Sequence, residues 1–278
     1  MNFLNLPGKK SLYNTAKAVI FPVPFKGKGR TPGIEKGPEV ILQASHMLFP
    51  YDAETDTDLN ELALFTLDSM VCPEGSQEML DELAGQGSSH FKKGKLVATL
   101  GGSYMISEGL VRAAMTRENS LSVLHLGAHP HHIDSVTGQQ DTMARIKETC
   151  MISHIGIRSM SKAEKNKIHI DNLVFARDIY NNGLNAAVDA LDVLGETVYL
   201  AINLDILDPA YMPTVVNPEP GGLDWYTLNN LIRMITREKT VIGFDVTGLV
   251  PQKQGLHAHV LAAKLVYKTL IYCLRSSR

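Results

Sequence analysis

The sequence predicts an α/β protein: one domain, residues 1–278, with helices covering both faces of a mainly parallel sheet. Three observations lead to this prediction. Apolar runs of strand length alternate with longer helix-like segments along the chain, a pattern typical of parallel sheets between two helical layers. The 278 residues are 44% hydrophobic and 20% charged, which is enough apolar material for a sizeable core. No linker divides the chain, so we expect a single domain rather than two.

Seven short apolar runs are predicted to be strands, because each is bounded by glycine, proline or polar residues. The run from Val198 to Ile206 is apolar at nearly every position, as expected for a strand covered on both faces. The predicted strands are residues 18–23, 96–100, 121–126, 151–157, 173–175, 198–206 and 240–246.

Helices are predicted between these strands. Pro38 stands at a favoured first-turn position, and Asp224 is a plausible N-cap. The last helix is apolar on more than one side; burial in a three-layer core explains this, and a subunit interface is the alternative. The predicted helices are residues 38–46, 77–91, 108–115, 184–194, 224–236 and 257–274, and residues 26–37 and 52–61 are predicted loops.

Composition excludes several classes of function. The formal net charge of −2 gives no reason to expect nucleic acid or an anionic membrane as a partner. No apolar run reaches the roughly 18 residues that a membrane-spanning helix needs, and the N-terminal residues do not have the pattern of a signal peptide. The three cysteines are scattered and odd in number, which fits a reducing compartment. We therefore expect a cytoplasmic protein.

Unusual polar residues follow three of the predicted strands. They are Gly101-Gly102-Ser103-Tyr104, Gly127-Ala128-His129-Pro130-His131-His132 and Asn203-Leu204-Asp205. Parallel strands bring such ends together along one edge of the sheet, where α/β proteins bind ligands. On an extended strand, Asn203 and Asp205 would point to the same side, since they are two residues apart.

His129 and His131 are the best candidates for metal ligands. An extended backbone would place both imidazoles on one side of the chain, and imidazole together with the Asp205 carboxylate suits zinc, manganese or iron. The alternative is that these are loop histidines bonded to neighbouring polar groups.

The sequence leaves more than one role for each of two other carboxylates, Asp208 and Asp245. Asp208 either caps the turn before Pro209 or assists chemistry at the edge. Asp245 lies inside an apolar strand, where a carboxylate needs a partner; this is either a backbone donor or an arginine, for which Arg158 is a candidate.

At these residues the chain resembles the ureohydrolase superfamily, which includes arginases, agmatinases, formiminoglutamases and guanidinobutyrases. Gly101-Gly102-Ser103-Tyr104 stands where that family has Gly-Gly-Asp-His, and Gly127-Ala128-His129-Pro130-His131 resembles its Asp-Ala-His-x-Asp. Asn203-Leu204-Asp205-Ile206-Leu207-Asp208-Pro209 is similar to its Asp-x-Asp-x-x-Asp-Pro, and Asp245-Val246-Thr247-Gly248 stands where it has Asp-x-x-Glu.

The resemblance implies a three-layer α/β/α fold with a mainly parallel, eight-stranded sheet. It also implies two manganese ions bridged by a hydroxide that attacks a guanidinium or amidine carbon, and assembly into trimers or hexamers.

The sequence departs from the family at the metal ligands. The six positions carry Tyr104, Gly127, His129, His131, Asn203 and Asp205, and only His129 and Asp205 keep the family's residue type. The resemblance places its guanidinium-binding glutamate at Gly248 and its proton-shuttle histidine near Gln140, so both substrate-binding positions are altered too.

The number of acidic side chains at this edge of the sheet determines how many metal ions it can bind. Two divalent ions carry four positive charges, which the family offsets with four aspartates, and only Asp205 remains of those. A neutral imidazole supplies no negative charge, so we do not expect an intact dimanganese centre. The sequence predicts either no metal or one zinc or manganese ion on His129, His131 and Asp205.

Two hypotheses follow. In the first, the chain is a ureohydrolase homologue that has lost the dimanganese hydrolysis and is non-canonical or inactive. In the second, it is an active hydrolase of a linear guanidino or amidine compound, with a single metal that activates water and with His132, Tyr104 or Asp208 assisting proton transfer.

Overall fold

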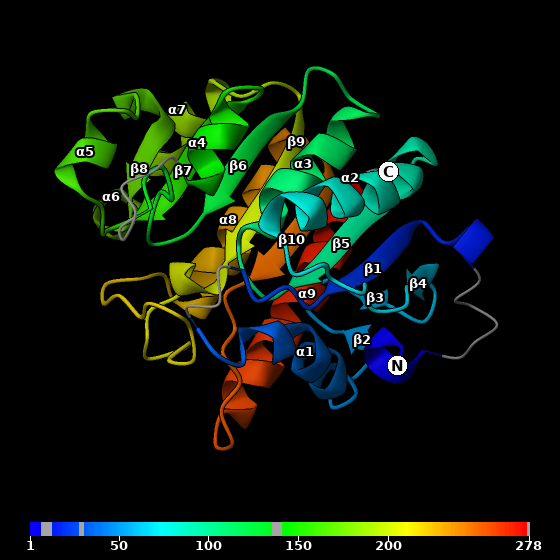
Figure 1. Ribbon diagram of the computed structural model, residues 1–278. Coiled ribbons are helices and arrows are strands. Elements are labelled where there is room, and N and C mark those ends of the chain that lie inside the picture. The colour runs from blue at the N-terminus through cyan, green and yellow to red at the C-terminus, as the bar shows by residue number, and fades with distance from the viewer. Residues whose placement is uncertain (7–12, 28–30, 135–140, 277–278) are drawn as a thin grey trace.

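An eight-stranded parallel sheet forms the centre of the computed structural model, which describes residues 1–6, 13–27, 31–134 and 141–276 (Figure 1). The strand order is β4-β1-β5-β10-β9-β6-β7-β8, and each neighbouring pair is parallel. The carboxyl ends of all eight strands therefore lie along one edge. The strands are β1 (Ala18–Val23), β4 (Leu64–Thr66), β5 (Leu96–Gly101), β6 (Ser122–Leu126), β7 (Met151–Ile157), β8 (Leu173–Phe175), β9 (Thr197–Asn203) and β10 (Thr240–Thr247).

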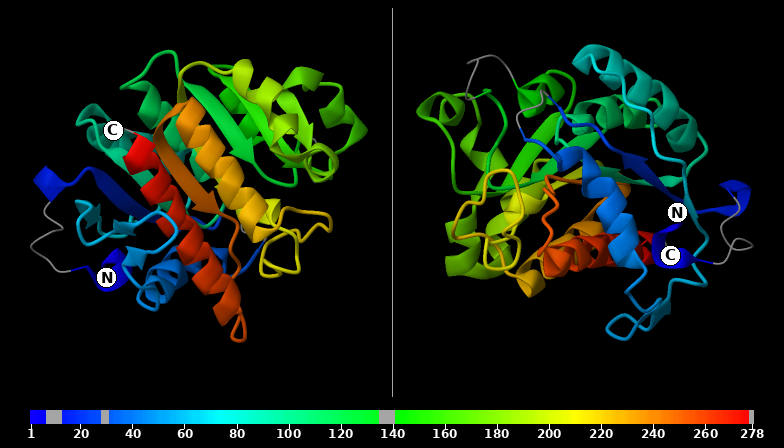
Figure 2. Two further views of the ribbon diagram at one scale, coloured as in Figure 1. Left: turned by 180° about the vertical axis from the view of Figure 1, so that it is seen from behind. Right: turned by 60° about the horizontal axis from the view of Figure 1, so that its bottom comes forward.

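Helices cover both faces of the sheet, so the molecule has three layers (Figure 2). One face packs against α1, α6, α7, α8 and α9, and the other packs against α2, α3 and α4. The alternation of strand side chains is visible in β1, where Ile20 joins the first core and Phe21 the second. The helices are α1 (Gly37–Ser45), α2 (Ser76–Lys92), α3 (Ile106–Met115), α4 (Thr142–Lys147), α5 (Lys162–Lys165), α6 (Ala176–Asn182), α7 (Val188–Asp192), α8 (Trp225–Glu238) and α9 (Leu256–Ser276).

The predicted α/β class, three layers and mainly parallel eight-stranded sheet are confirmed. Several local predictions are wrong. The loop predicted for residues 52–61 contains part of a small hairpin, β2 (Tyr51–Asp52) and β3 (Thr57–Asp58). The helix predicted for residues 184–194 is a 3-10 turn followed by α7, and the strand predicted for residues 198–206 ends at Asn203 in a 3-10 turn, Leu204–Ile206.

Helix α9 is buried by its own chain. It packs against α1, α8 and β10, and side chains on several of its sides are inaccessible, among them Ala262, Leu265, Val266 and Leu270. Burial in the three-layer core thus accounts for its apolar character. Within the part of the chain that the structure describes, no helix is long and apolar enough to cross a membrane.

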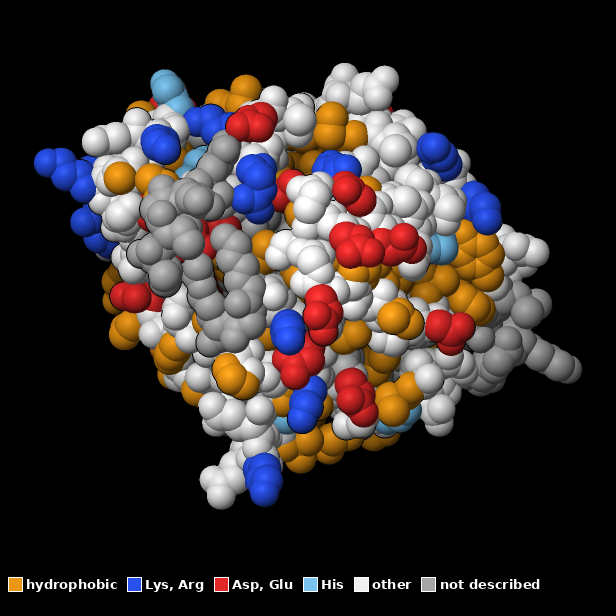
Figure 3. Space-filling view, viewed as in Figure 1, with side chains coloured by type: hydrophobic (Ala, Val, Ile, Leu, Met, Phe, Trp, Pro, Cys, Tyr) orange, Lys and Arg blue, Asp and Glu red, His pale blue; other side chains and the backbone are white. Residues whose placement is uncertain are grey.

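Acidic and basic side chains are mixed on the face of the molecule seen in Figure 3, and neither sign covers a continuous area there.

Candidate functional site

The three polar segments meet at the carboxyl edge of the sheet, as the sequence predicts. Tyr104, which follows β5, stacks on His131, which follows β6, with ring centroids 3.8 Å apart and planes at 19°. Asn203 at the end of β9 lies beside the same histidine, with its Nδ2 3.4 Å from His131 Nε2. The site is thus assembled from loops that are far apart in sequence.

His129 and Asp205 form the closest pair of the predicted ligands. The His129 Nδ1 atom lies 3.1 Å from Asp205 Oδ2, and the other carboxylate oxygen accepts a hydrogen bond from the Ala128 amide at 2.9 Å. Asp205 is not on a strand, contrary to the prediction, because the chain turns after Asn203. The Asp205 backbone amide instead donates to Asn203 Oδ1 at 3.3 Å, and this contact holds the Asn203 side chain against the turn.

His131 does not follow the extended path predicted for residues 129–131. Its φ is +52°, in the left-handed region, so the alternation of an extended chain does not apply. Its ring centroid lies 6.0 Å from that of His129, and the ring faces Tyr104 and Asn203. Burial lowers the pKa of His131, which favours the neutral imidazole.

Tyr104 has a partner that sequence reasoning did not identify. Its hydroxyl donates to Asp141 Oδ2 at 2.7 Å, and Asp141 Oδ1 accepts from the Thr142 amide at 2.8 Å as the N-cap of α4. A tyrosine at a ligand position of the family is therefore held in this chain by a hydrogen bond to a carboxylate.

A chain of three buried imidazoles borders the same edge. The Nδ1 atoms of His125 and His154 are 3.1 Å apart, and the Nε2 atoms of His154 and His132 are 3.0 Å apart. Burial lowers the pKa of His125 and of His154 well below the usual range. Burial, assisted by the charge of Lys147, lowers the pKa of His132 to about 4.

The sequence analysis missed His125 and His154. Each of the two apolar runs that form β6 and β7 contains one histidine, and this was the available signal in the sequence. The two strands pair so that His125 and His154 lie side by side. His132, predicted to assist catalysis, bonds to His154 and lines a hollow of about 500 Å³ with Lys147 and Lys167. The described contacts place it in the imidazole chain, and none of them joins it to His129 or Asp205.

Two glycines, Gly127 and Gly248, stand where the family resemblance leads us to expect carboxylates. A Cβ atom at Gly127 would lie 2.8 Å from His125 Cε1, 2.9 Å from His125 Nε2 and 3.2 Å from Asp205 Oδ1. A Cβ atom at Gly248, where φ is +92°, would lie 2.4 Å from Asn203 Oδ1. Neighbouring side chains already occupy the space that larger residues would need at both positions.

Asp208 has the contacts of a turn cap. Its carboxylate accepts hydrogen bonds from the amides of Ala210, Gly221 and Gly222, and these bonds lower its pKa. The alternative that Asp208 caps the turn before Pro209 fits these contacts, and no described contact joins it to His129 or Asp205.

Arg158 is not the partner of Asp245, so that expectation is wrong. Its guanidinium donates to backbone carbonyls, including those of Asp205 at 2.6 Å and Glu219 at 2.7 Å. Asp245 Oδ2 instead accepts a hydrogen bond from the Tyr199 hydroxyl at 2.9 Å.

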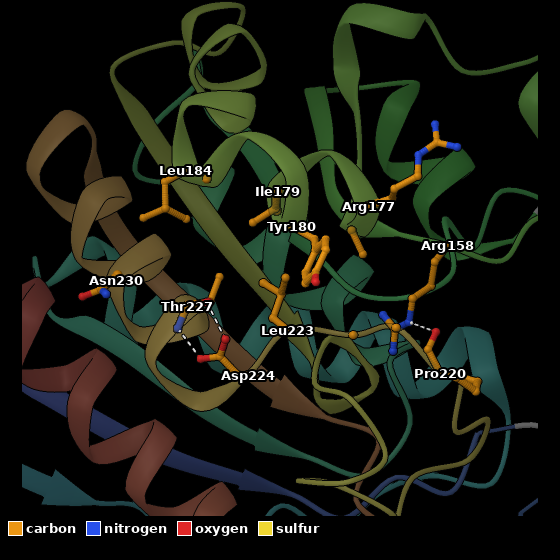
Figure 4. A pocket seen from close by; sticks show the side chains of 14 residues that line it. Arg158, Arg177, Ile179, Tyr180, Leu184, Pro220, Leu223, Asp224, Thr227 and Asn230 are labelled. Carbon is orange, nitrogen blue, oxygen red and sulfur yellow. Dashed lines mark hydrogen bonds between the residues drawn. The ribbon is translucent and has the colours of Figure 1, made fainter.

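A hollow of about 850 Å³, lined in part by Arg158, lies between α6 and the start of α8 (Figure 4). Tyr180 and Leu223 contribute apolar surface, and Asp224 accepts hydrogen bonds from Thr227 at its rim. None of the predicted ligands lines this hollow.

No group of three histidine, cysteine or carboxylate side chains in the described ranges is arranged to hold one metal ion. Gln140, which the sequence analysis predicts to be a substrate-binding position, lies outside the described residues.

Comparisons with known proteins identify the family. The model of the Arginase family matches residues 16–272. An N(1)-aminopropylagmatine ureohydrolase of Thermus thermophilus is 32% identical over 94% of this chain and 92% of its own length. One from Synechocystis is 32% identical over 96% and 92%. The crystal structure of agmatine ureohydrolase of Thermoplasma volcanium is 26% identical, covers 95% of this chain and 92% of its own, and superposes with a TM-score of 0.85. The chain belongs to the arginase family.

Proposed function

We propose that this protein is an arginase-family homologue that does not form the family's dinuclear metal centre and does not perform the hydrolysis that depends on it. The observation that carries the proposal is the contact between Gly127 and His125. Position 127 is where the family has a bridging carboxylate, and here the imidazole of His125 fills the space that such a side chain would need.

The donor set does not fit two divalent cations. Asp205 is the one carboxylate at the six ligand positions, and both of its oxygens already accept hydrogen bonds or lie against His129. Asn203 provides a neutral amide, Tyr104 is bonded to Asp141, and Gly127 has no side chain. A pair of divalent ions would carry far more positive charge than this edge offsets.

The ligand class follows from the relatives. The similar proteins are named as ureohydrolases of N(1)-aminopropylagmatine and as agmatinases, so we propose a small guanidino or amidine compound as the ligand of this edge. We also propose a homo-oligomer, trimeric or hexameric, on the family resemblance.

Metal analysis and turnover test the proposal together. The purified protein is incubated with excess MnCl₂, desalted, and measured for manganese per chain and for urea release from arginine, agmatine and guanidinobutyrate. We expect far less than two manganese per chain and no urea release above that of heat-denatured protein. Two manganese per chain with manganese-dependent turnover would overturn the proposal.

A single-metal hydrolase is the second candidate, and the approach of His129 to Asp205 favours it. In that case His129, His131 and Asp205 would hold one zinc or manganese ion, which lowers the pKa of bound water to about 7 when present. His131 would first have to turn away from Tyr104 and Asn203.

The two candidates differ in stoichiometry and in their response to one substitution. The second requires about one metal ion per chain, with loss of that metal in His129→Ala. His46→Ala provides a matched control, because His46 is an exposed histidine at the end of α1. Equal metal content in the parent and both variants would exclude the single-metal candidate.

A further inference from the structure

We propose that His125 and His154 form a lock that keeps the side-chain space of position 127 closed. The inference rests on the proposed function, because it explains how this edge is held in an arrangement without a dinuclear centre. The lock is a steric device: His125 occupies the space, and His154 holds the His125 ring in place.

The His125 ring lies directly over Gly127. His125 and Gly127 are two residues apart around the end of β6, and the ring lies over the glycine: a Cβ atom there would come within 2.8 Å of the ring. Real Cβ contacts below about 3 Å require a neighbour to move. The backbone is not the obstacle, since Gly127 is not among the glycines with positive φ.

Burial and hydrogen bonds hold the His125 ring in this position. His125 and His154 are both fully inaccessible or nearly so, at 1% and 0% exposure, so the surrounding core fixes their positions. The 3.1 Å hydrogen bond between their Nδ1 atoms fixes the direction of the His125 ring. His154 is in turn held from the other side by His132 through the 3.0 Å bond between their Nε2 atoms.

The lock excludes a carboxylate side chain from position 127. The point that a Cβ atom at position 127 would occupy is also 3.2 Å from Asp205 Oδ1. A carboxylate placed there would meet both the imidazole and the one remaining acidic ligand. Restoring the aspartate of the family at this position therefore requires release of the His125 ring as well.

A thermal-unfolding cycle without metal tests the lock directly. Gly127→Ala adds one methyl group and no charge, and in EDTA we expect it to lower the Tm by about 4 to 8 °C through overpacking. In His125→Ala and His154→Ala backgrounds, where the ring is absent or free to turn, the same substitution should cost less than half of that shift. Gly85→Ala in α2 is the control: no atom lies near the added methyl group, so the Tm should stay constant or rise.

Equal Tm losses from Gly127→Ala in all three backgrounds would overturn the lock. If the single variant fails to accumulate as soluble protein, soluble yield replaces Tm as the readout. Recovery of yield in the double variants then supports the lock, and failure to recover contradicts it.

A second arm links the lock to metal binding. Gly127→Asp/Asn203→Asp, made with and without His154→Ala, is titrated with MnCl₂ by calorimetry. We expect at least tenfold tighter binding when His154 is replaced, and equal binding would contradict the lock. Because the EDTA measurements involve no metal, they remain decisive even if manganese in the parent protein were to overturn the proposed function.

Discussion

Asp245 is a carboxylate placed where its charge is costly. It is fully buried in β10, where its Oδ2 atom accepts a hydrogen bond from the Tyr199 hydroxyl and the Ser107 hydroxyl also acts on the carboxylate. Burial raises the pKa of Asp245 from the usual 3.8 to about 7, because the ionised form loses its hydration. The folded protein therefore binds this proton more tightly than the unfolded chain does.

Stability should consequently respond to pH through Asp245. Binding of this proton stabilises the folded state fully below about pH 4. This contribution to the free energy of unfolding is lost as the pH rises through about 7, and the loss reaches about 4 kcal/mol in total. Asn cannot ionise, so Asp245→Asn should gain stability relative to the parent as the pH rises from 5 to 8. Thermal unfolding of both proteins across this range measures the difference, and a constant difference would show that Asp245 does not titrate there.

Some residues of the site could be identified from their local sequence, and others could not. His129 and Asp205 could be identified because each stands directly after an apolar run, where parallel sheets collect functional groups. His125 and His154 could not be paired in advance, since their contact depends on the register between β6 and β7. The left-handed backbone of His131 and its stacking on Tyr104, which comes from another loop, likewise have no signal in the local sequence.

At the scale of elements, the N-cap predicted for α8 from the sequence is present in the structure. Asp224 was expected to cap this helix, and its carboxylate accepts hydrogen bonds from the amide and hydroxyl of Thr227 at 2.8 and 2.7 Å. The cap satisfies donors that the first turn of a helix leaves free.

Removing this cap should have a modest and specific cost. Asp224→Ala is expected to lower stability by about 1 kcal/mol, which is about 2 to 4 °C in Tm for a chain of this size. Asp224→Ser keeps an oxygen that can accept from the Thr227 amide and should retain most of the parent Tm. If both variants melt like the parent, the capping bond adds no measurable stability.

The elements that sequence reasoning missed are short. The strand β4 and the helices α4, α5 and α6 span three to seven residues each, too few to show a helical or strand period. Their positions are set by packing: β4 pairs with β1, and α6 rests on β7 and β8. The longer helices α2, α8 and α9 follow their predicted ranges closely, because several turns of apolar spacing mark them.

At the scale of the whole molecule, one buried lysine joins distant parts of the chain. Lys268 of α9 is 2% exposed, and its Nζ atom lies 2.8 Å from Asp52 Oδ2 and also bonds to Glu54. Asp52 is 3% exposed, so this pair is shielded from water. The contact ties the β2–β3 hairpin to the C-terminal helix.

Breaking this bridge should destabilise the entire fold. Lys268→Met leaves the buried Asp52 without its closest cation, and such losses cost about 3 kcal/mol or more; Lys264, at 3.6 Å, compensates in part. We expect a Tm lower by about 6 °C or more, with part of the loss recovered in Asp52→Asn/Lys268→Met. Recovery in the double variant distinguishes an unpaired charge from lost packing, and its absence would assign the effect to packing alone.

The topology was accessible from the sequence only in part. The alternation of elements predicted the layers and the parallel sheet, and the family resemblance supplied the number of strands. The insertion of β10 between β5 and β9 has no local signal, because it depends on which apolar strands pair across the full length of the chain.

That insertion has a consequence for how the protein is made. Strands β5 and β9 leave the ribosome before β10, yet neither can complete its hydrogen bonding on one side until residues 240–247 arrive. The nascent chain therefore carries one unfinished edge on β5 from residue 101 onward and a second on β9 from residue 203 until β10 is made, and such edges favour aggregation. A stop codon placed shortly before residue 240 would remove β10, the strand that joins β5 to β9.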